Sequence, residues 1–473
     1  MNREKFGVIL PITLLAYFLI LMDNSIIFTS SVQIGESLGL SAAALSWVSS
    51  AYTLTFGGFL LLSGRLSDLL GRKRIFLIGL LIFGLSSLVI GLSQTAEMVI
   101  MMRAVQGIGS SIIAPTTLAL IMDAYQNNMR QRAISYYGAT AGIGSSIGLL
   151  VGGGLTSLIS WRAGFLINVP FTLVLFILTL KYVNPSVRRK EKIDYLGSLF
   201  SIIGLVGIIY GFTEGKLSFV VIGMIFICLF ILWERKTSSP ILPLALFQNK
   251  IRSGAYVTRL LFMMAMLPFW FFLPQMMQSQ YGFSALESGF AFLPLTIVNF
   301  IIAMQLPKLT SKFGNNKILL IGEIILFMGL ILLAISNPEN GYWLTVFVPM
   351  IILGLGQGLI LAPVTSAGVY EAPDKLAGIA SGVTNTMHQI GGPIGLSVIV
   401  ATTTNFQTEI FIMAVFTPVS YTHLDVYKRQ HQIGGPIGLS VIVATTTNFQ
   451  TEIFIMAVFT LISLLVVAII VNK

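Results

Sequence analysis

Residue types that build soluble catalytic and metal sites are scarce in this sequence. Its single cysteine, Cys228, lies in an apolar run, which excludes an intrachain disulfide and a cysteine-based metal site. The three histidines, His388, His423 and His431, form no ligand cluster. No nucleophile–base set or phosphate-binding loop appears, and the glycine-rich runs follow no strand pattern, so they are not dinucleotide fingerprints. We therefore expect no enzyme activity, no metal and no cofactor.

Charge is scarce as well, because only 10% of the 473 residues are charged whereas 55% are hydrophobic. A soluble chain carries about 25% charged residues, so this composition and a mean hydropathy of +0.88 predict an all-α polytopic membrane protein in a lipid bilayer. The net charge of +10 sits between apolar runs, and it indicates topology and not nucleic-acid binding. The first apolar run has no small-residue cleavage site, so we expect it to be retained.

Apolar runs of about 20 residues, the length that crosses a bilayer as a helix, recur along the chain. We expect about fourteen spans, at residues 6–29, 44–63, 75–93, 98–121, 133–157, 163–182, 196–214, 217–233, 253–275, 287–306, 317–335, 343–367, 377–400 and 453–471. Lysine and arginine gather in alternate connections, such as those at residues 65–74, 188–192 and 308–317. This bias places these connections and both termini on the cytoplasmic face of the cell membrane.

The connection Gly64–Arg74 reads G-R-L-S-D-L-L-G-R-K-R and joins two apolar runs into an antiparallel hairpin. Gly64 and Gly71 allow the helix ends to approach closely. Asp68 can accept hydrogen bonds from arginine or from a helix N-terminus, and Arg72 adds to the positive charge. A purely topogenic anchor is the plain alternative.

The pattern G-x-L-x-D-x-x-G-R-K/R of this connection resembles the signature loop between helices 2 and 3 of the major facilitator superfamily of transporters. The resemblance implies a fold of two helix bundles that rock against each other. It also implies that Gly64, Asp68, Gly71 and Arg72 form a conformational latch on the cytoplasmic side.

Three pairs of segments recur at nearly constant spacing. The offsets are 243 positions between Leu66–Arg74 and Leu309–Lys317, 248 between Ala114-Pro115 and Ala362-Pro363, and 247 between Ile143–Leu149 and Ile390–Leu396. Each offset moves a feature forward by eight helices. We therefore predict parallel repeats, with a six-helix bundle at residues 1–185, a linker and an inserted two-helix hairpin at 186–250, and a second six-helix bundle at 251–473.

One further repeat has a different origin. His388–Thr417 recurs letter for letter at His431–Thr460, and the polar segment Pro418–Gln430 separates the copies. The second copy begins partway along a predicted helix, which is not how repeat folds are built. Our hypothesis is that residues 418–460 are an assembly artefact, because joining Thr417 to Leu461 gives one uninterrupted last helix. A genuine extra half-helix and loop is the alternative.

An ionisable group inside a membrane costs roughly 2.5–3.5 kcal/mol or more, so each one is a functional candidate. Asp23 in the first span and Arg103 in the fourth both lie about 25 Å from the cytoplasmic face by helix rise. They can therefore meet as an ion pair that couples proton release to cation binding, or that acts only as a static clamp. Arg103–Gly109 resembles the superfamily motif R-x-x-Q-G-x-G, and Leu21–Ile27 resembles a first-helix segment of fourteen-span drug–proton antiporters.

Glycines recur about four apart in the fifth span, a spacing that permits close helix packing. The run from Gly138 to Gly154 resembles the exporter motif G-x-x-x-G-P-x-x-G-G, although Leu149 stands where that family has proline. The resemblance assigns the antiporter motif to Gly144, Gly148, Gly152 and Gly153. Ordinary small-residue packing is the alternative.

Other polar residues are candidates for a substrate cavity, namely Gln106, Asn168, Gln275 and Asn299. Arg259 and Glu323 lie near the cytoplasmic ends of their spans, where we expect them to snorkel or to pair with loop charges. The tenth span has no mid-membrane acid, so divalent organic cations are disfavoured.

These residues together predict a proton-coupled antiporter that exports amphipathic or cationic drugs as small-molecule substrates. The proton gradient would supply the energy, and we expect a monomer. A transporter of a metabolite with the same fold, or a non-transport membrane protein, are the alternatives.

Overall fold

The computed structural model describes residues 6–185, 194–238, 240–373, 376–404 and 448–471. Every regular element in these ranges is helical. The helices are α1 (Ile9–Leu38), α2 (Ala42–Leu70), α3 (Arg72–Leu92), α4 (Ala96–Ala124), α5 (Asn127–Leu158), α6 (Trp161–Leu166), α7 (Asn168–Tyr182), α8 (Tyr195–Thr213), α9 (Leu217–Glu234), α10 (Lys250–Tyr281), α11 (Ala285–Ala291), α12 (Leu293–Phe313), α13 (Asn315–Ile335), α14 (Val348–Gly368), α15 (Ala377–Thr404) and α18 (Asn448–Val471).

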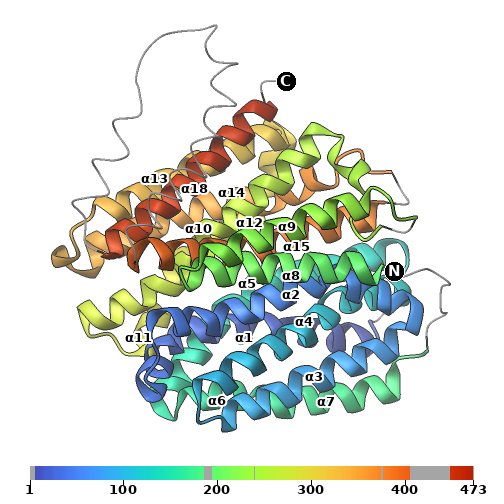
Figure 1. Cartoon of the computed structure of the whole chain (residues 1–473), viewed down its shortest axis with the longest axis horizontal. Coiled ribbons are helices and arrows are strands. Elements are labelled where there is room, and N and C mark those ends of the chain that lie inside the picture. Colours follow the sequence, from blue (N-terminus) through green and yellow to red (C-terminus); the bar gives the residue numbers. More distant parts are fainter. Residues whose placement is uncertain (1–5, 186–193, 239, 374–375, 405–447, 472–473) are drawn as a thin grey trace, which may run out of the picture.

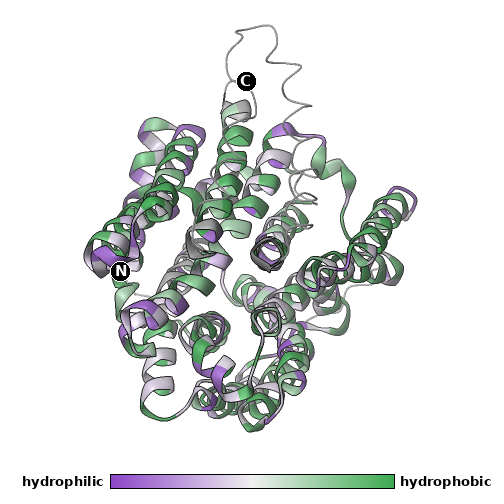
Figure 2. Ribbon diagram, turned by 60° about the vertical axis from the view of Figure 1, so that its left-hand side comes forward, coloured by the Kyte–Doolittle hydropathy of each residue, from purple (hydrophilic) through white to green (hydrophobic). Residues whose placement is uncertain are grey.

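The prediction of an all-α polytopic membrane protein is confirmed. Eleven of the described spans have the length and apolar composition needed to cross a bilayer, and hydrophobic residues cover most of their length (Figure 2). Helices α5, α15 and α18 add lengths of 32, 28 and 24 residues. The total of fourteen spans stays a prediction.

The helices form two groups (Figure 1). Helices α1 to α7 pack on one another, and α10 to α18 pack on one another above them. Helix α8 lies against α2 of the first group and α15 of the second, where its Leu205 and Ile209 contact Leu54 and Ile390. These contacts support the predicted bundles and inserted hairpin, whose exact division remains a proposal.

Equivalent turns and glycine contacts bear out the internal repeat. Gly71 ends α2 with φ 94° and ψ 133°, and Gly314 ends α12 with φ 84° and ψ 152°, an offset of 243 positions. A Cβ atom on Gly109 of α4 would lie 2.8 Å from the backbone nitrogen of Phe83. The equivalent Cβ on Gly356 of α14 would lie 2.7 Å from that of Leu326. The same close approaches therefore recur in both helix groups.

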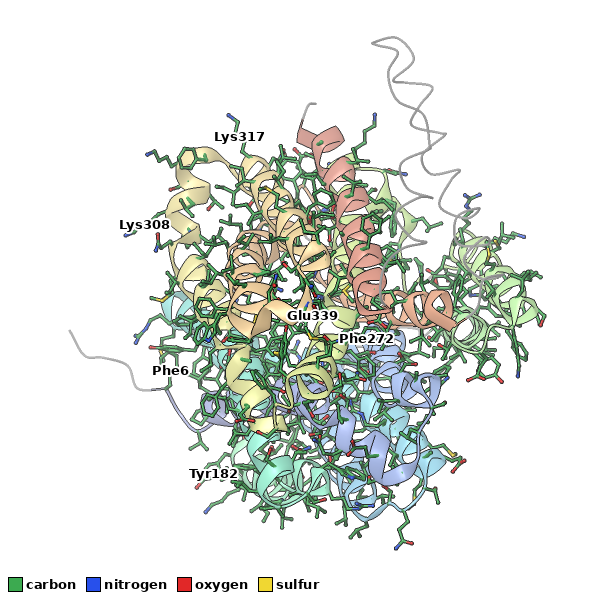
Figure 3. All side chains as sticks on the ribbon, turned by 90° about the vertical axis from the view of Figure 1, so that its left-hand side faces the viewer. Phe6, Tyr182, Phe272, Lys308, Lys317 and Glu339 are labelled. Atoms are coloured by element: carbon green, nitrogen blue, oxygen red, sulfur yellow. The ribbon has the colours of Figure 1, made fainter. Side chains whose placement is uncertain are left out.

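The end of the molecule that carries the Gly71 and Gly314 turns is called the basic-loop end below. Lys308 on α12 and Lys317 on α13 are exposed near it and project away from the helices (Figure 3). The opposite end carries the start of α11 and the turn before α6 (Figure 1). Assignment of the basic-loop end to the cytoplasm remains a prediction from the charge bias.

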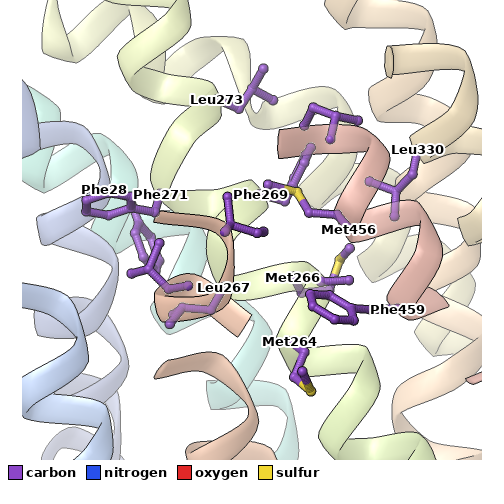
Figure 4. Packing of buried hydrophobic residues seen from close by; sticks show 14 of the residues in the cluster. Phe28, Met264, Met266, Leu267, Phe269, Phe271, Leu273, Leu330, Met456 and Phe459 are labelled. Atoms are coloured by element: carbon purple, nitrogen blue, oxygen red, sulfur yellow. The ribbon is translucent and has the colours of Figure 1, made fainter. Parts of the chain in front are cut away.

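Large flexible side chains fill the interior of the second group. Met266, Phe269 and Leu273 of α10 pack with Met456 and Phe459 of α18 (Figure 4). All five are at most 1% exposed. This core ties α18 firmly to α10.

The duplicated segment contributes one part of each copy to the described helices. Residues 388–404 of the first copy belong to α15, and residues 448–460 of the second copy begin α18. These two parts together make one complete copy. Helix α18 runs without a break through Thr460 and Leu461, as predicted, while residues 418–447 of the suspected insertion lie outside the described residues.

Candidate functional site

A buried ion pair lies inside the first helix group. Arg103 of α4 donates from Nη1 to Oδ2 of Asp23 on α1, with a distance of 2.7 Å between the two atoms. Both side chains are fully buried. The helix rise had placed them at the same depth, and the structure brings them into direct contact. An isolated charge at this position would be costly, and the pairing offsets that cost.

Two amides complete the surroundings of the Asp23 carboxylate. Gln106 of α4 donates from Nε2 to Oδ1 at 2.9 Å, and Asn168 of α7 donates from Nδ2 to the same oxygen at 2.7 Å. Ser87 of α3 accepts from Gln106 at 2.8 Å. Asp23 therefore accepts three hydrogen bonds, two on Oδ1 and one on Oδ2. A carboxylate has about four acceptor positions, so one position on Oδ2 is left for a proton.

Arg103 is held by more than its acid partner. Its Nε donates to the carbonyl oxygen of Val48 on α2 at 3.0 Å. Its guanidinium carbon lies 4.1 Å from the centre of the Tyr52 ring, a cation–π distance. Nη2 of Arg103 and Oδ1 of Asn168 have no partner within the described part of the chain. The network is thus rigidly positioned and still retains spare donor and acceptor capacity.

The glycine stripe of α5 packs directly on the segment of α1 that carries Asp23. A Cβ atom on Gly148 would lie 2.8 Å from the carbonyl oxygen of Met22, and one on Gly152 would lie 2.7 Å from Cα of Ile26. Gly144 lies against Leu21 in the same way, with 3.1 Å between its would-be Cβ and Cβ of Leu21. Side chains at these positions would push the two helices apart.

The far end of the same stripe touches the second helix group. A Cβ atom on Gly153 would lie 2.5 Å from the carbonyl oxygen of Ala285, where α11 begins. Gln278 of α10 donates from Nε2 to the carbonyl oxygen of Thr29 on α1 at 3.1 Å, and Gln33 of α1 donates to Gln278 at 3.0 Å. The two groups are therefore sealed against each other at the end opposite the basic loops.

The glycine–arginine loop joins α2 to α3 and binds α4. Gly71 needs its positive φ of 94°, which disfavours other residues. Arg72 forms an ion pair with Asp123 of α4 and donates to the carbonyl oxygen of Ala119 at 2.6 Å. Gly64 has open space around it, and the side chain of Asp68 lies outside the described residues. These two contacts of Arg72 lie within the first helix group.

A sequence model of the Major Facilitator Superfamily matches residues 13–396, which is most of the chain. The chain belongs to the major facilitator superfamily. It is 31% identical over 416 residues to the puromycin resistance protein pur8 of Streptomyces alboniger, covering 84% of this chain and 81% of that protein. It is 30% identical over 409 residues to multidrug resistance protein 3 of Bacillus subtilis strain 168, covering 84% and 79%.

Solved structures support the same fold for this superfamily member. The transporter PepTSo of the POT family superposes with a TM-score of 0.68 over 99% of this chain and 98% of its own, at 13% sequence identity. An identity this low shows the fold alone. The membership makes the chain a transporter and sets aside the alternative of a non-transport membrane protein.

Two of the four residues expected to line a substrate cavity lie elsewhere in this facilitator structure. Gln106 and Asn168 are fully buried and bind Asp23, so they belong to the ion-pair network and not to an open cavity. Gln275 is half-buried and donates to the carbonyl oxygen of Phe271 in its own helix at 2.8 Å. Asn299 is half-buried on α12, where its backbone faces Gly358 of α14.

The expectation that Arg259 and Glu323 snorkel or pair with loop charges is wrong. Arg259 is 7% exposed and donates from Nη1 to the carbonyl oxygen of Leu361 at 3.4 Å. Glu323 is fully buried and accepts from Ser463 of α18 at 2.9 Å. Both side chains point into the protein. The direction in which a side chain leaves its helix depends on how the helix packs, and not only on the depth of the residue in the membrane.

A cavity of about 530 Å³ opens at the basic-loop end of the second helix group. Its lining includes Thr310 and Ser311 of α12, Asn316 of α13 and Tyr370 after α14. None of the predicted site residues lines it.

Proposed function

We propose that this chain is a proton-coupled antiporter that exports amphipathic drugs across the cytoplasmic membrane. Its similarity to a puromycin resistance protein and to a multidrug resistance protein supports drugs as the substrate class. The observation that carries proton coupling is the buried Asp23–Arg103 pair on a glycine-packed helix. We further propose that both termini face the cytoplasm, that the transporter functions as a monomer, and that the proton gradient supplies the energy without a cofactor.

Protonation of Asp23 would remove the negative member of the pair and leave Arg103 as the one charge in the network. The balance of forces on α1 then changes, because Asp23 holds α1 to α4 and α7 through its hydrogen bonds. Helix α5 follows α1 through the contact at Gly148, and its end meets α11 at Gly153. This chain of contacts leads from the proton site to the seal between the helix groups.

The basic-loop end would be held in one of the two states by the latch of Gly64, Asp68, Gly71 and Arg72. Arg72 already binds Asp123 and Ala119 of α4. Motion of α4 relative to the α2–α3 turn would break these bonds. The latch therefore responds to the same helix that carries Arg103.

Asp23→Asn tests the coupling. The asparagine keeps the shape of the carboxylate but cannot exchange a proton, so we expect loss of proton-driven efflux of a fluorescent amphipathic dye from membrane vesicles. Protein level in the membrane and thermal stability are measured in parallel. Asp23→Glu, which restores an ionisable group, is expected to recover part of the efflux.

Glu36→Gln is the matched control, because it removes an exposed acid from the same helix. Its efflux should equal that of the unaltered protein. Full proton-driven efflux by Asp23→Asn would remove Asp23 from the mechanism and would leave a static clamp as the role of the pair.

A further inference from the structure

A second buried arginine lies between the two helix groups, and its charge has no acidic partner in the described structure. Arg259 of α10 has one described hydrogen bond, the long contact of 3.4 Å to the carbonyl oxygen of Leu361. Its Nε atom is buried and donates to nothing in the described part of the chain. No described carboxylate lies within ion-pair distance of it. The guanidinium thus retains most of its five donors.

The groups around Arg259 come from both halves of the molecule. His388 of α15 and Tyr17 of α1 both lie within electrostatic range of the guanidinium. The Nδ1 atom of His388 is buried and also has no described partner. Tyr17 stacks on Tyr137 of α5, with 4.0 Å between the ring centres and 12° between the ring planes. Four helices therefore bring two unsatisfied nitrogen groups and a pair of stacked aromatic rings into the same region.

This arrangement is costly unless an anion joins it. A buried charge without a counter-ion is unfavourable, and buried donors without acceptors add to that cost. The planar guanidinium matches the two oxygens of a carboxylate. The neighbouring rings offer apolar and aromatic contact to the body of the same molecule.

Arg259 differs from Arg103 in its counter-ion and in the helix groups that surround it. The charge of Arg103 is neutralised by Asp23 within the first helix group, whereas Arg259 lies within electrostatic range of Tyr17 in the first group and His388 in the second. A ligand bound at Arg259 would therefore contact the two groups at once. In an alternating-access transporter, such a position is where the transported molecule binds.

We propose that Arg259 and His388 bind the carboxylate of the transported compound, and that Tyr17 and Tyr137 contact its aromatic part. The substrate class is then an amphipathic aromatic carboxylate, and a cationic drug is disfavoured because no described acid lies beside the site. The inference rests on the proposed export function for its physiological meaning. The binding itself can be measured without proton-driven transport.

The experiment uses the purified full chain in lipid nanodiscs and two fluorescent probes, N-dansyl-phenylalanine and its amide. The probes differ only in the carboxylate. We expect the unaltered protein to bind the acid about tenfold or more tightly than the amide, because charge-assisted hydrogen bonds supply this difference. Arg259→Gln should abolish the preference, and Arg259→Lys should keep only part of it.

Arg235→Gln is the matched control, since it removes an exposed arginine after α9 and should leave the preference unchanged. His388→Gln should reduce it and provides a second test if Arg259→Gln does not fold. Equal binding of both probes by the unaltered protein, or a preference that survives Arg259→Gln, would overturn the proposal. Preserved probe preference without any proton-driven efflux would instead contradict the proposed function alone.

Discussion

The two helix groups repeat each other in backbone packing but not in charge. Gly79 of α3 and Gly322 of α13, which are 243 positions apart, both lie against the neighbouring helix through isoleucine side chains, Ile112 and Ile360. The next residue is Leu80 in the first group and the buried acid Glu323 in the second. Close packing therefore belongs to the shared fold, whereas each buried charge is particular to one group.

The two helix groups also differ in whether their buried ionisable groups have counter-ions. The charges of Asp23 and Arg103 neutralise each other at 2.7 Å. Glu323 and Arg259 are buried in the second group without a described counter-ion, and Oε2 of Glu323 has no described partner. The first group thus holds an ion pair, whereas the second holds two buried ionisable groups without a described counter-ion. Four predictions test this difference.

The largest effect is expected when the ion pair between Asp23 and Arg103 is broken. Arg103→Gln leaves Asp23 buried without its counter-ion, which costs about 3–5 kcal/mol. Thermal unfolding of the detergent-solubilised protein should show a large loss of stability. The double variant with Asp23→Asn should recover much of this loss, and additive losses would mean that the pair is not energetically coupled.

A smaller effect is expected from the shared packing. Gly148 meets Met22, and Gly395 meets Met264, at equivalent positions of the two groups. Alanine at either site should lower the free energy of unfolding by about 1–3 kcal/mol through overpacking. Only Gly148→Ala should also alter the proton dependence of efflux, because only Gly148 lies beside Asp23.

Gly154→Ala is the control for both glycine variants, since the nearest atom to its Cβ would be 3.8 Å away. It should leave stability and efflux unchanged. Equal changes in proton dependence for Gly148→Ala and Gly395→Ala would break the distinction between the groups.

Removal of the buried acid Glu323, which has no described counter-ion, should cost little stability. Glu323→Leu introduces the residue found at position 80, and the apolar side chain avoids the cost of burying an acid that accepts one described hydrogen bond. We expect the midpoint of thermal unfolding to stay the same or to rise. The reverse change, Leu80→Glu, should lower it. A large loss in Glu323→Leu would contradict the expectation and would show that the hydrogen bond from Ser463 stabilises the contact between α13 and α18.

The smallest effect is expected from deletion of residues 405–447. The described parts of the two copies already supply one complete segment to α15 and α18, and the deletion yields the same sequence as removal of residues 418–460. We expect unchanged membrane level and efflux. Loss of either in the shortened chain would favour a genuine function for the insertion.

The sequence alone predicted the helical membrane fold and the meeting of Asp23 with Arg103, because depth in a bilayer follows from helix rise. It also predicted the repeat, since the three pairs of similar segments recur at nearly equal offsets in the sequence. It did not predict which way Gln106, Asn168 or Arg259 faces. The rotation of a helix is decided by packing across segments that are far apart in the chain, and α4, α7 and α10 lack strong apolar faces that would reveal it.

The same limit explains why Tyr52, Ser87 and His388 were missed. Tyrosine and serine are common in membrane helices, and a lone histidine carries no spacing signal. The contacts of Tyr52 and Ser87, and the proposed role of His388, follow only when α2, α3 and α15 are placed beside their partners.

The hairpin of α8 and α9 has a mechanical consequence. Since α8 touches both α2 and α15, any motion that separates those two helices has to shear apolar contacts on at least one side of it. Leu205 and Ile209 therefore resist sliding between α2 and α15. Shortening these two side chains would change the rate of the transport cycle before it changes which substrate is transported.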